Sequence, residues 1–191
     1  MLTASAWIRL DGTPVNQATI VGQRDTASPQ QNNWQFLVAG TGNPTGEAPN
    51  KLIFNFWQGN SEGGKVVSNT LLSRNQWHHV ACTYDGANMK LYINGISDNT
   101  VASTATINSL DVPTLIGRLA LQDPKAFNGK LDEVRIYDRA LSAAEASQLY
   151  NLERPAPPLI TSHPPNWDVA IANNATFTSM ANGATDYQWR R

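Results

Sequence analysis

The feature that most limits the fold of this sequence is a succession of short segments in which apolar and polar residues alternate. In residues 3–10 (TASAWIRL), for example, apolar residues alternate with Ser5, Trp7 and Arg9. Further segments of this kind cover residues 18–23, 34–39, 51–57, 77–84, 89–94, 114–118 and 130–137. Turn-forming clusters such as LDGTP, QGNSEGG and DGAN separate the segments. Period-two alternation without intervening helices predicts an all-β protein, a two-sheet antiparallel sandwich.

One helix is predicted after the last of these segments. In residues 139–151 (RALSAAEASQLYN), Ser142 is placed to cap the helix, and Glu145, three residues on, completes a capping box. Residues 153–165 are rich in proline, which cannot continue a helix, so they are predicted to be a linker. Residues 166–191 alternate again but are too few to form a two-sheet core of their own.

Composition excludes several classes of function. The 191 residues carry a formal net charge of −1, so there is no electrostatic footprint for nucleic acid. No apolar stretch is long enough to cross a bilayer, and no membrane insertion is expected. Because Cys82 is the one cysteine, no intrachain disulfide can form, and we expect its thiol to be buried and unreactive.

Several stretches together resemble the laminin-G/pentraxin-like, concanavalin A-type jelly rolls of bacterial secreted proteins. They are SAWIRL, TIVGQRD, NWQFLVA, QWHHVACTYDGANMKLYINGI, TLIGR and FNGKLDEVRIYDRALSAAEASQLYN. The resemblance implies a jelly roll over residues 1–152 with one short C-terminal helix, from a larger secreted bacterial protein at an extracellular or cell-surface location. Residues 166–191 resemble the truncated start of a bacterial immunoglobulin-like domain.

The ends of the sequence carry a further expectation. The family usually begins with another strand, which this sequence lacks, so we expect an unpaired sheet edge that can accept a strand. We predict that residues 166–191 pack as a strand or hairpin on a jelly-roll sheet. That sheet belongs either to the same chain or to a second copy, in which case the protein is a homodimer that exchanges tails.

Two adjacent histidines raise the question of catalysis. His78 and His79 lie in one predicted strand and point to opposite faces, so they cannot share a metal unless the strand bulges. We expect both to be packed strand side chains. The alternative is a calcium- or other metal-dependent hydrolase, in which one of them is the base for cleavage of an ester, lactone or glycosidic bond. The paired glutamates of jelly-roll glycoside hydrolases are missing, because the adjacent Asp132 and Glu133 point to opposite faces.

The resemblance also implies a calcium ion. Many sandwiches of this family hold one Ca²⁺ near an edge through the aspartate of a G-x-L/I-D-E-V strand, which corresponds here to Asp132. Calcium prefers about six to eight oxygen ligands, more than Asp132 alone supplies. The alternative, that Asp132 only hydrogen-bonds a neighbouring turn, stays open.

The tryptophans give the candidate binding site. Trp7, Trp34 and Trp77 are predicted to lie in the core. Trp57 differs, because in KLIFNFWQGN it ends a strand at a glycine-rich loop and shares a face with Asn55. An indole beside amides at a loop is typical of sugar sites, where the ring meets CH groups and the amides meet hydroxyls.

The favoured function is therefore a non-catalytic carbohydrate-binding or adhesion module. The ligand-binding residues are predicted to be Trp57, Asn55 and Gln35, with Arg24 and Asp25 from the preceding loop. Two alternatives stay open: the metal-dependent hydrolase, and a structural spacer that binds no small ligand.

Overall fold

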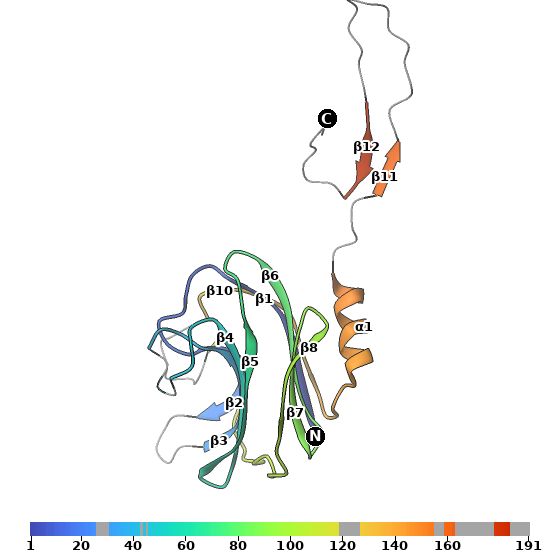
Figure 1. Ribbon diagram of the computed structural model, residues 1–191. Coiled ribbons are helices and arrows are strands. Elements are labelled where there is room, and N and C mark those ends of the chain that lie inside the picture. The colour runs from blue at the N-terminus through green and yellow to red at the C-terminus, as the bar shows by residue number, and fades with distance from the viewer. Residues whose placement is uncertain are drawn as a thin grey trace, which may run out of the picture. The chain divides into compact units, whose positions relative to one another are not determined.

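The structure is a computed structural model that describes residues 1–25, 31–42, 44, 46–118, 127–154, 159–162 and 178–183. The chain divides into two compact units, Met1–Leu152 and Glu153–Arg191. In the first unit, two five-stranded antiparallel sheets pack face to face, and helix α1 (Ala143–Glu153) follows them (Figure 1). The predicted all-β sandwich with one short C-terminal helix is confirmed.

The first sheet, called sheet A, has the strand order β10-β1-β6-β7-β8. Its strands are β10 (Gly129–Tyr137), β1 (Leu2–Leu10), β6 (Trp77–Tyr84), β7 (Asn88–Ile93) and β8 (Ile96–Ala102). The turn from β6 to β7 forms because the Asp85 carboxylate accepts the N–H groups of Ala87 at 2.9 Å and Asn88 at 2.6 Å. Gly86 supplies the positive φ of 92° that this turn requires.

The second sheet, called sheet B, has the order β5-β4-β3-β2-β9. Its strands are β5 (Ser61–Leu71), β4 (Lys51–Gln58), β3 (Gln31–Val38), β2 (Ala18–Asp25) and β9 (Thr114–Ile116). The core lies between the sheets, where alternate side chains of both sheets meet. Ile8, Phe36, Phe54 and Val80 are among its fully buried members.

Cys82 belongs to this core, as predicted. It is fully buried between core residues of sheet A, and burial raises the pKa of its thiol. The neutral thiol therefore dominates at physiological pH, and Cys82 packs as a small apolar side chain.

Two strands, β5 and β8, were not predicted. The start of β5 contains Gly63 and Gly64, which read as a turn in the sequence. In the structure, a Cβ on Gly63 would lie 2.9 Å from the Phe56 ring, and one on Gly64 would lie 2.6 Å from Met89 Sδ. These glycines therefore mark a close approach between a strand and core side chains rather than a loop.

Of the three tryptophans predicted to lie in the core, one is buried there and two are not. Trp34 is in the core with 4% of its surface exposed, as predicted. The prediction for Trp77 was wrong, because it is 42% exposed. Trp7 is half-buried on the outer face of sheet A, where its ring lies 5.7 Å from that of Tyr150. In β1 the core-facing positions are those of Ile8 and its alternates, so Trp7 points the other way.

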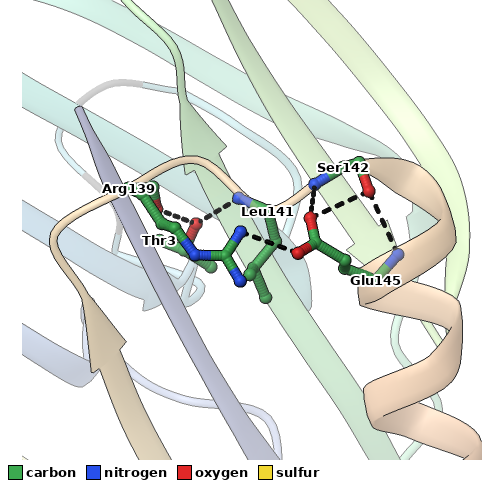
Figure 2. Close-up of polar contacts among 5 residues, drawn as sticks. All are labelled: Thr3, Arg139, Leu141, Ser142 and Glu145. Atoms are coloured by element: carbon green, nitrogen blue, oxygen red, sulfur yellow. Dashed lines mark hydrogen bonds and ion pairs between the residues drawn. The ribbon is translucent and has the colours of Figure 1, made fainter.

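Helix α1 starts with the predicted capping box (Figure 2). Ser142 Oγ accepts the Glu145 N–H at 3.2 Å, and Glu145 Oε2 accepts the Ser142 N–H at 2.8 Å. The preceding turn is fixed to β1, because Thr3 Oγ1 donates to the Arg139 carbonyl at 2.7 Å and accepts the Leu141 N–H at 2.9 Å. The Arg139 guanidinium pairs with Glu145 Oε1 at 2.8 Å.

α1 packs on the outer face of sheet A (Figure 1). Ala146 is fully buried in a cluster with Ala81 of β6 and Tyr92 of β7. One turn further along, Tyr150 lies beside Trp7 and His79. In the part of the chain that the structure describes, no helix is long and apolar enough to cross a bilayer.

The second unit contains β11 (Leu159–Ser162) and β12 (Met180–Asn182), which pair with each other in a two-stranded antiparallel sheet. A strand therefore lies inside the segment predicted as a linker. The prediction that residues 166–191 join a jelly-roll sheet concerns mainly residues outside those described. For these residues it stays a prediction.

Candidate functional site

Four of the five predicted ligand-binding residues lie together on the outer face of sheet B. Gln35 of β3 is the cross-strand partner of Asn55 of β4, and Trp57 follows Asn55 by two residues on the same face. Arg24 lies at the end of β2, not in a loop as predicted, because the strand continues to Asp25. We call Arg24, Gln35, Asn55 and Trp57 the polar platform.

Arg24 contacts two other platform residues, Gln35 and Trp57, and also Asn32 of β3. Its Nε donates to Asn32 Oδ1 at 2.9 Å and its Nη1 donates to Gln35 Oε1 at 3.0 Å. The same guanidinium lies over the Trp57 indole, with its Cζ 5.0 Å from the ring centroid. A guanidinium held at both positions fixes the orientation of the indole and places donors beside it.

Asn55 contributes an unused acceptor. It is only 6% exposed, and its Nδ2 donates to Glu62 Oε1 at 2.8 Å. Its Oδ1 is buried and has no hydrogen-bond partner within the described part of the chain. A buried acceptor without a donor costs about 1–3 kcal/mol, so a donor brought by a ligand or by water would recover stability here.

An ion pair borders the platform. Lys65 of β5, the cross-strand partner of Asn55, donates from Nζ to Glu47 Oε1 at 2.7 Å. The hydrogen bond and charge of Glu47, with the charge of Glu62, raise the pKa of Lys65 against a smaller opposing effect of burial. The pair thus keeps Lys65 charged at neutral pH.

The corner that carries Trp57 is held by Asn108, which sequence reasoning missed. The Asn108 N–H donates to the Trp57 carbonyl at 2.8 Å, and its Nδ2 donates to the carbonyls of Asn32 and Gly59, both at 2.8 Å. Its Oδ1 accepts the Gly59 N–H at 2.7 Å. One side chain therefore ties the ends of β3 and β4 together, which makes the corner rigid before any ligand binds.

Two details of the predicted site differ in the structure. The glycine-rich loop after Trp57 is a tight hairpin, in which Gln58 pairs with Ser61 and Gly59 has a φ of 59°. Glu62 and Lys65 of β5 therefore stand beside the platform, and they were missed because β5 was missed. The side chain of Asp25 lies outside the described residues.

His79 lies under α1 and away from the platform. It is fully buried, with its ring 5.6 Å from that of Trp7 and 6.0 Å from that of Tyr150. Burial, and then the positive charge of Arg135, lower the pKa of His79 to about 4. A buried imidazole that stays neutral at physiological pH is a packing residue here, as expected.

His78 points to the opposite face, as predicted, and is 9% exposed. Its Nε2 lies 3.1 Å from the Ser73 carbonyl and 3.0 Å from Ser73 Oγ. A carbonyl oxygen only accepts, so the first contact places the ring proton on Nε2. Since Nε2 then donates, the Ser73–His78 pair is not arranged as a nucleophile and its base.

Asp132 is exposed on β10, and its Oδ1 accepts the N–H of Glu133 at 2.9 Å. Glu133 has a φ of 47°, at a bulge between β1 and β10. Across the described ranges, no three or more histidine, cysteine, aspartate or glutamate side chains gather as a metal site. These residues do not by themselves fit a calcium ion, which stays a prediction for Asp132.

A shallow hollow of about 190 Å³ lies where β10 meets α1. Tyr137, Leu149 and Leu152 line it, and the Arg139–Glu145 ion pair forms part of its wall (Figure 2). Because this pair is neutral overall and the capping box already occupies the helix N-terminus, the hollow offers no anion site.

Comparisons with known proteins agree with the sandwich. Three similar structures are a candidate carbohydrate binding protein from Bacteroides ovatus (22% identity, TM-score 0.62), domain 4 of an extracellular arabinanase from Geobacillus stearothermophilus in complex with arabinotriose (22%, 0.56), and a heptameric SAP-like pentraxin from Limulus polyphemus (18%, 0.56). The matches cover 77%, 78% and 78% of this chain, and 40%, 66% and 69% of those chains. The match thus spans less than half of the Bacteroides protein.

A search of curated proteins found no match to this sequence. A laminin-G family model, described as the Concanavalin A-like lectin/glucanases superfamily, matches residues 1–147. The matched range ends within α1, so it contains every strand of the sandwich and none of the second unit. Over residues 1–147, this chain belongs to the concanavalin A-like lectin/glucanase superfamily.

Proposed function

We propose that this chain is a non-catalytic carbohydrate-binding module that holds a sugar on the polar platform of sheet B. The observation that carries the proposal is the position of Arg24, which contacts both the Trp57 ring and the Gln35 amide. Residues from three different strands thereby form one connected aromatic and polar surface. Such a surface matches a pyranose or furanose ring, which is apolar on its CH face and polar around its rim.

The roles of the platform residues follow from their geometry. The half-buried Trp57 ring meets the CH face of the sugar, while Arg24 donates to ring or hydroxyl oxygens. Asn55 Oδ1, which is buried and has no donor among the described residues, accepts a sugar hydroxyl when the ligand binds. Asn108 holds the corner in place, so little conformational entropy is lost on binding.

The relatives support this class of ligand. One of the similar structures is an arabinanase domain in complex with arabinotriose, and another is a candidate carbohydrate binding protein. A module of this kind fits an extracellular or cell-surface position in a larger secreted bacterial protein. Packing of residues 166–191 on a jelly-roll sheet, either of the same chain or of a second copy in a tail-exchanged homodimer, belongs to the same proposal.

The proposal is tested by an array of immobilised neutral oligosaccharides that includes arabinotriose, followed by titration of the ligand that is retained. Trp57→Ala should weaken binding by about 1–3 kcal/mol, because a stacking residue is lost, while the melting temperature changes little. Trp77→Ala, an exposed tryptophan of sheet A, is the matched control and should bind neutral sugars normally.

Three outcomes would contradict the proposal. If no sugar is retained, the spacer alternative is favoured. If Trp57→Ala unfolds the protein, with a loss of about 3–5 kcal/mol, Trp57 is structural and the site lies elsewhere. If a retained sugar is cleaved, and cleavage stops with chelator and with His78→Ala, the hydrolase alternative is favoured.

The calcium prediction is tested by melting the protein in EDTA and in millimolar Ca²⁺. If Asp132 binds the ion, the unmutated chain melts at a lower temperature in EDTA, whereas Asp132→Ala melts at the same temperature in both buffers. Identical curves for the unmutated chain in the two buffers would count against calcium.

A further inference from the structure

The outer face of sheet A carries an exposed tryptophan that its helix does not cover. Trp77, the first residue of β6, is 42% exposed. Its cross-strand partner in β1 is Arg9, and the partner of Arg9 in β10 is Lys130. Directly opposed residues share a face, so Trp77, Arg9 and Lys130 form one row across three strands. We call this row, with Arg74 of the loop before β6, the basic row.

The position of the basic row explains why it stays open. The pairing of β6 with β7 begins at Val80 and Ile93, so Trp77 lies beyond the end of β7. Tyr150 of α1 stacks with Trp7 and His79, which form the neighbouring row. The helix therefore covers that row, and the basic row lies beside it.

The loop before β6 is fixed to the same corner of the sheet. The Asn75 N–H donates to the Leu10 carbonyl at 2.8 Å, which ties residues 73–76 to the end of β1. Arg74 is thereby held close to the end of the strand that carries Arg9.

The charges of the basic row are only partly compensated. Arg9 Nε lies 3.2 Å from Asp11 Oδ1, so this guanidinium is paired. The exposed side chains of Arg74 and Lys130 make no hydrogen bond or ion pair with any residue that the structure describes. Among the described residues, Asp132 lies two positions after Lys130 in β10, where it is the cross-strand partner of Trp7 in the next row.

The exposed Trp77 indole lies near two cations, Arg74 and Lys130, that have no partner among the described residues, and this arrangement favours one class of ligand. The ring offers a flat apolar surface for the CH face of a sugar, and the cations attract a negative group on its rim. A nucleic acid would need many more phosphate contacts than a few cations can make, and the chain carries a net charge of −1.

We propose that the basic row is a second binding site, which takes a sugar ring bearing a negative charge. The ring of Trp77 stacks on the sugar, and Lys130 and Arg74 bind its charged group. This site does not depend on the polar platform, because the two sites lie on different sheets. The sandwich would thus bind acidic sugars on sheet A and neutral sugars on sheet B. Carboxylate and sulfate share this chemistry, so both are probed.

The experiment uses isothermal titration of the full chain with trigalacturonic acid, with a sulfated carrageenan tetrasaccharide, and with neutral maltotriose. At least one acidic probe should bind, and its affinity should fall as NaCl rises, because salt screens exposed charges. Trp77→Ala should weaken that binding by about tenfold or more, and Lys130→Gln by about threefold. Binding of trigalacturonic acid alone would identify the charged group of the ligand as a uronate carboxylate. Binding of the carrageenan tetrasaccharide alone would identify it as a sulfate.

The controls separate this site from the polar platform. Lys90→Gln removes a lysine from the same face of sheet A at a distance from the row, and Trp57→Ala removes the platform indole; both should leave acidic binding unchanged. Lys130→Gln keeps the test valid if Trp77→Ala folds poorly. The proposal is overturned if neither acidic probe binds, if maltotriose competes equally at the same site, or if Trp57→Ala rather than Trp77→Ala abolishes acidic binding.

Discussion

Side chains on the outer faces of the two sheets are shielded from water in different ways. On sheet A, Ala81 and Tyr92 are buried because α1 lies on them and adds Ala146 to the cluster. On sheet B, Leu37 and Ile53 form a small buried apolar cluster on the outer face. Beside it, the nearly buried amides of Gln35 and Asn55 make hydrogen bonds to polar side chains. Apolar side chains on a sheet face are removed from water when another element packs on them, whereas buried polar side chains need hydrogen-bond partners.

This difference bears on function. The part of sheet A beneath α1 is buried and gains stability from the helix, and the second site proposed above lies on the uncovered row at the end of the sheet. Among the described residues of sheet B, Asn55 Oδ1 is a buried acceptor without a hydrogen-bond donor. If recognition occurs on the polar platform as proposed, substitutions beneath α1 should affect mainly stability, and substitutions on the platform should affect mainly binding.

The largest effect is expected beneath α1. Ala146→Asp would bury a carboxylate against Ala81 and Tyr92 without a partner, and should lower the free energy of unfolding by about 3 kcal/mol or more. Chemical denaturation of the variant measures this loss. Ala144→Asp, on the exposed side of the same helix, is the matched control and should change stability by about 0.5 kcal/mol or less. Equal denaturation curves for the two variants would show that α1 is not needed to cover the sheet.

The next effect is a loss of stability in mild acid, through His79. Its pKa is lowered from 6.5 to about 4 in the folded protein, so below pH 6.5 the unfolded chain takes up a proton that the folded chain refuses. The stabilisation is complete above pH 6.5 and is lost as the pH falls towards 4, by about 3 kcal/mol at most.

Equilibrium unfolding measured between pH 7.5 and 5 checks this prediction, because carboxylates contribute little in that window. His79→Gln should be less stable at neutral pH but should lose less stability on acidification. The same slope of unfolding free energy against pH in both proteins would show that His79 does not titrate as its burial implies.

These results show which parts of the molecule were accessible to sequence reasoning. Period-two alternation predicted β1, β6 and β7 because, apart from His78, their core-facing positions carry apolar or aromatic residues. The capping box of Ser142 and Glu145 predicted the start of α1, because its signal lies within four neighbouring residues. Local patterns of this kind need no knowledge of the rest of the chain.

The features that were not predicted correctly depend on contacts between residues far apart in the sequence. β5 looked like a loop because Gly63 and Gly64 stand where Phe56 and Met89 leave no room for side chains. Trp77 was assigned to the core from its position in the family pattern, but it lies on the face of His79, opposite to the core residues Val80 and Cys82. Arg24 and Trp57 were both assigned to the site, but their contact depends on the pairing of β2 with β3 and of β3 with β4.

The smallest effect is expected on sheet B, at alkaline pH, from the Lys65–Glu47 pair. The pKa of Lys65 is raised above 10.5, chiefly by its hydrogen bond to Glu47, so the stabilisation is present below pH 10.5 and is lost as the pH rises through the raised value. Because the pair is partly exposed, a double-mutant cycle of Lys65→Met and Glu47→Gln should give a coupling of about 0.2–1 kcal/mol at pH 8 that fades as the pH rises through the raised pKa of Lys65. Lys130→Met, at a lysine that forms no ion pair with any described residue, is the control and should show no coupling to Glu47→Gln. A coupling that persists at high pH would mean that the pair acts by packing rather than by charge. We expect sheet A to lose stability in acid through His79 and sheet B to lose stability in alkali through Lys65. A coupling that does not change with pH would remove the second half of this contrast.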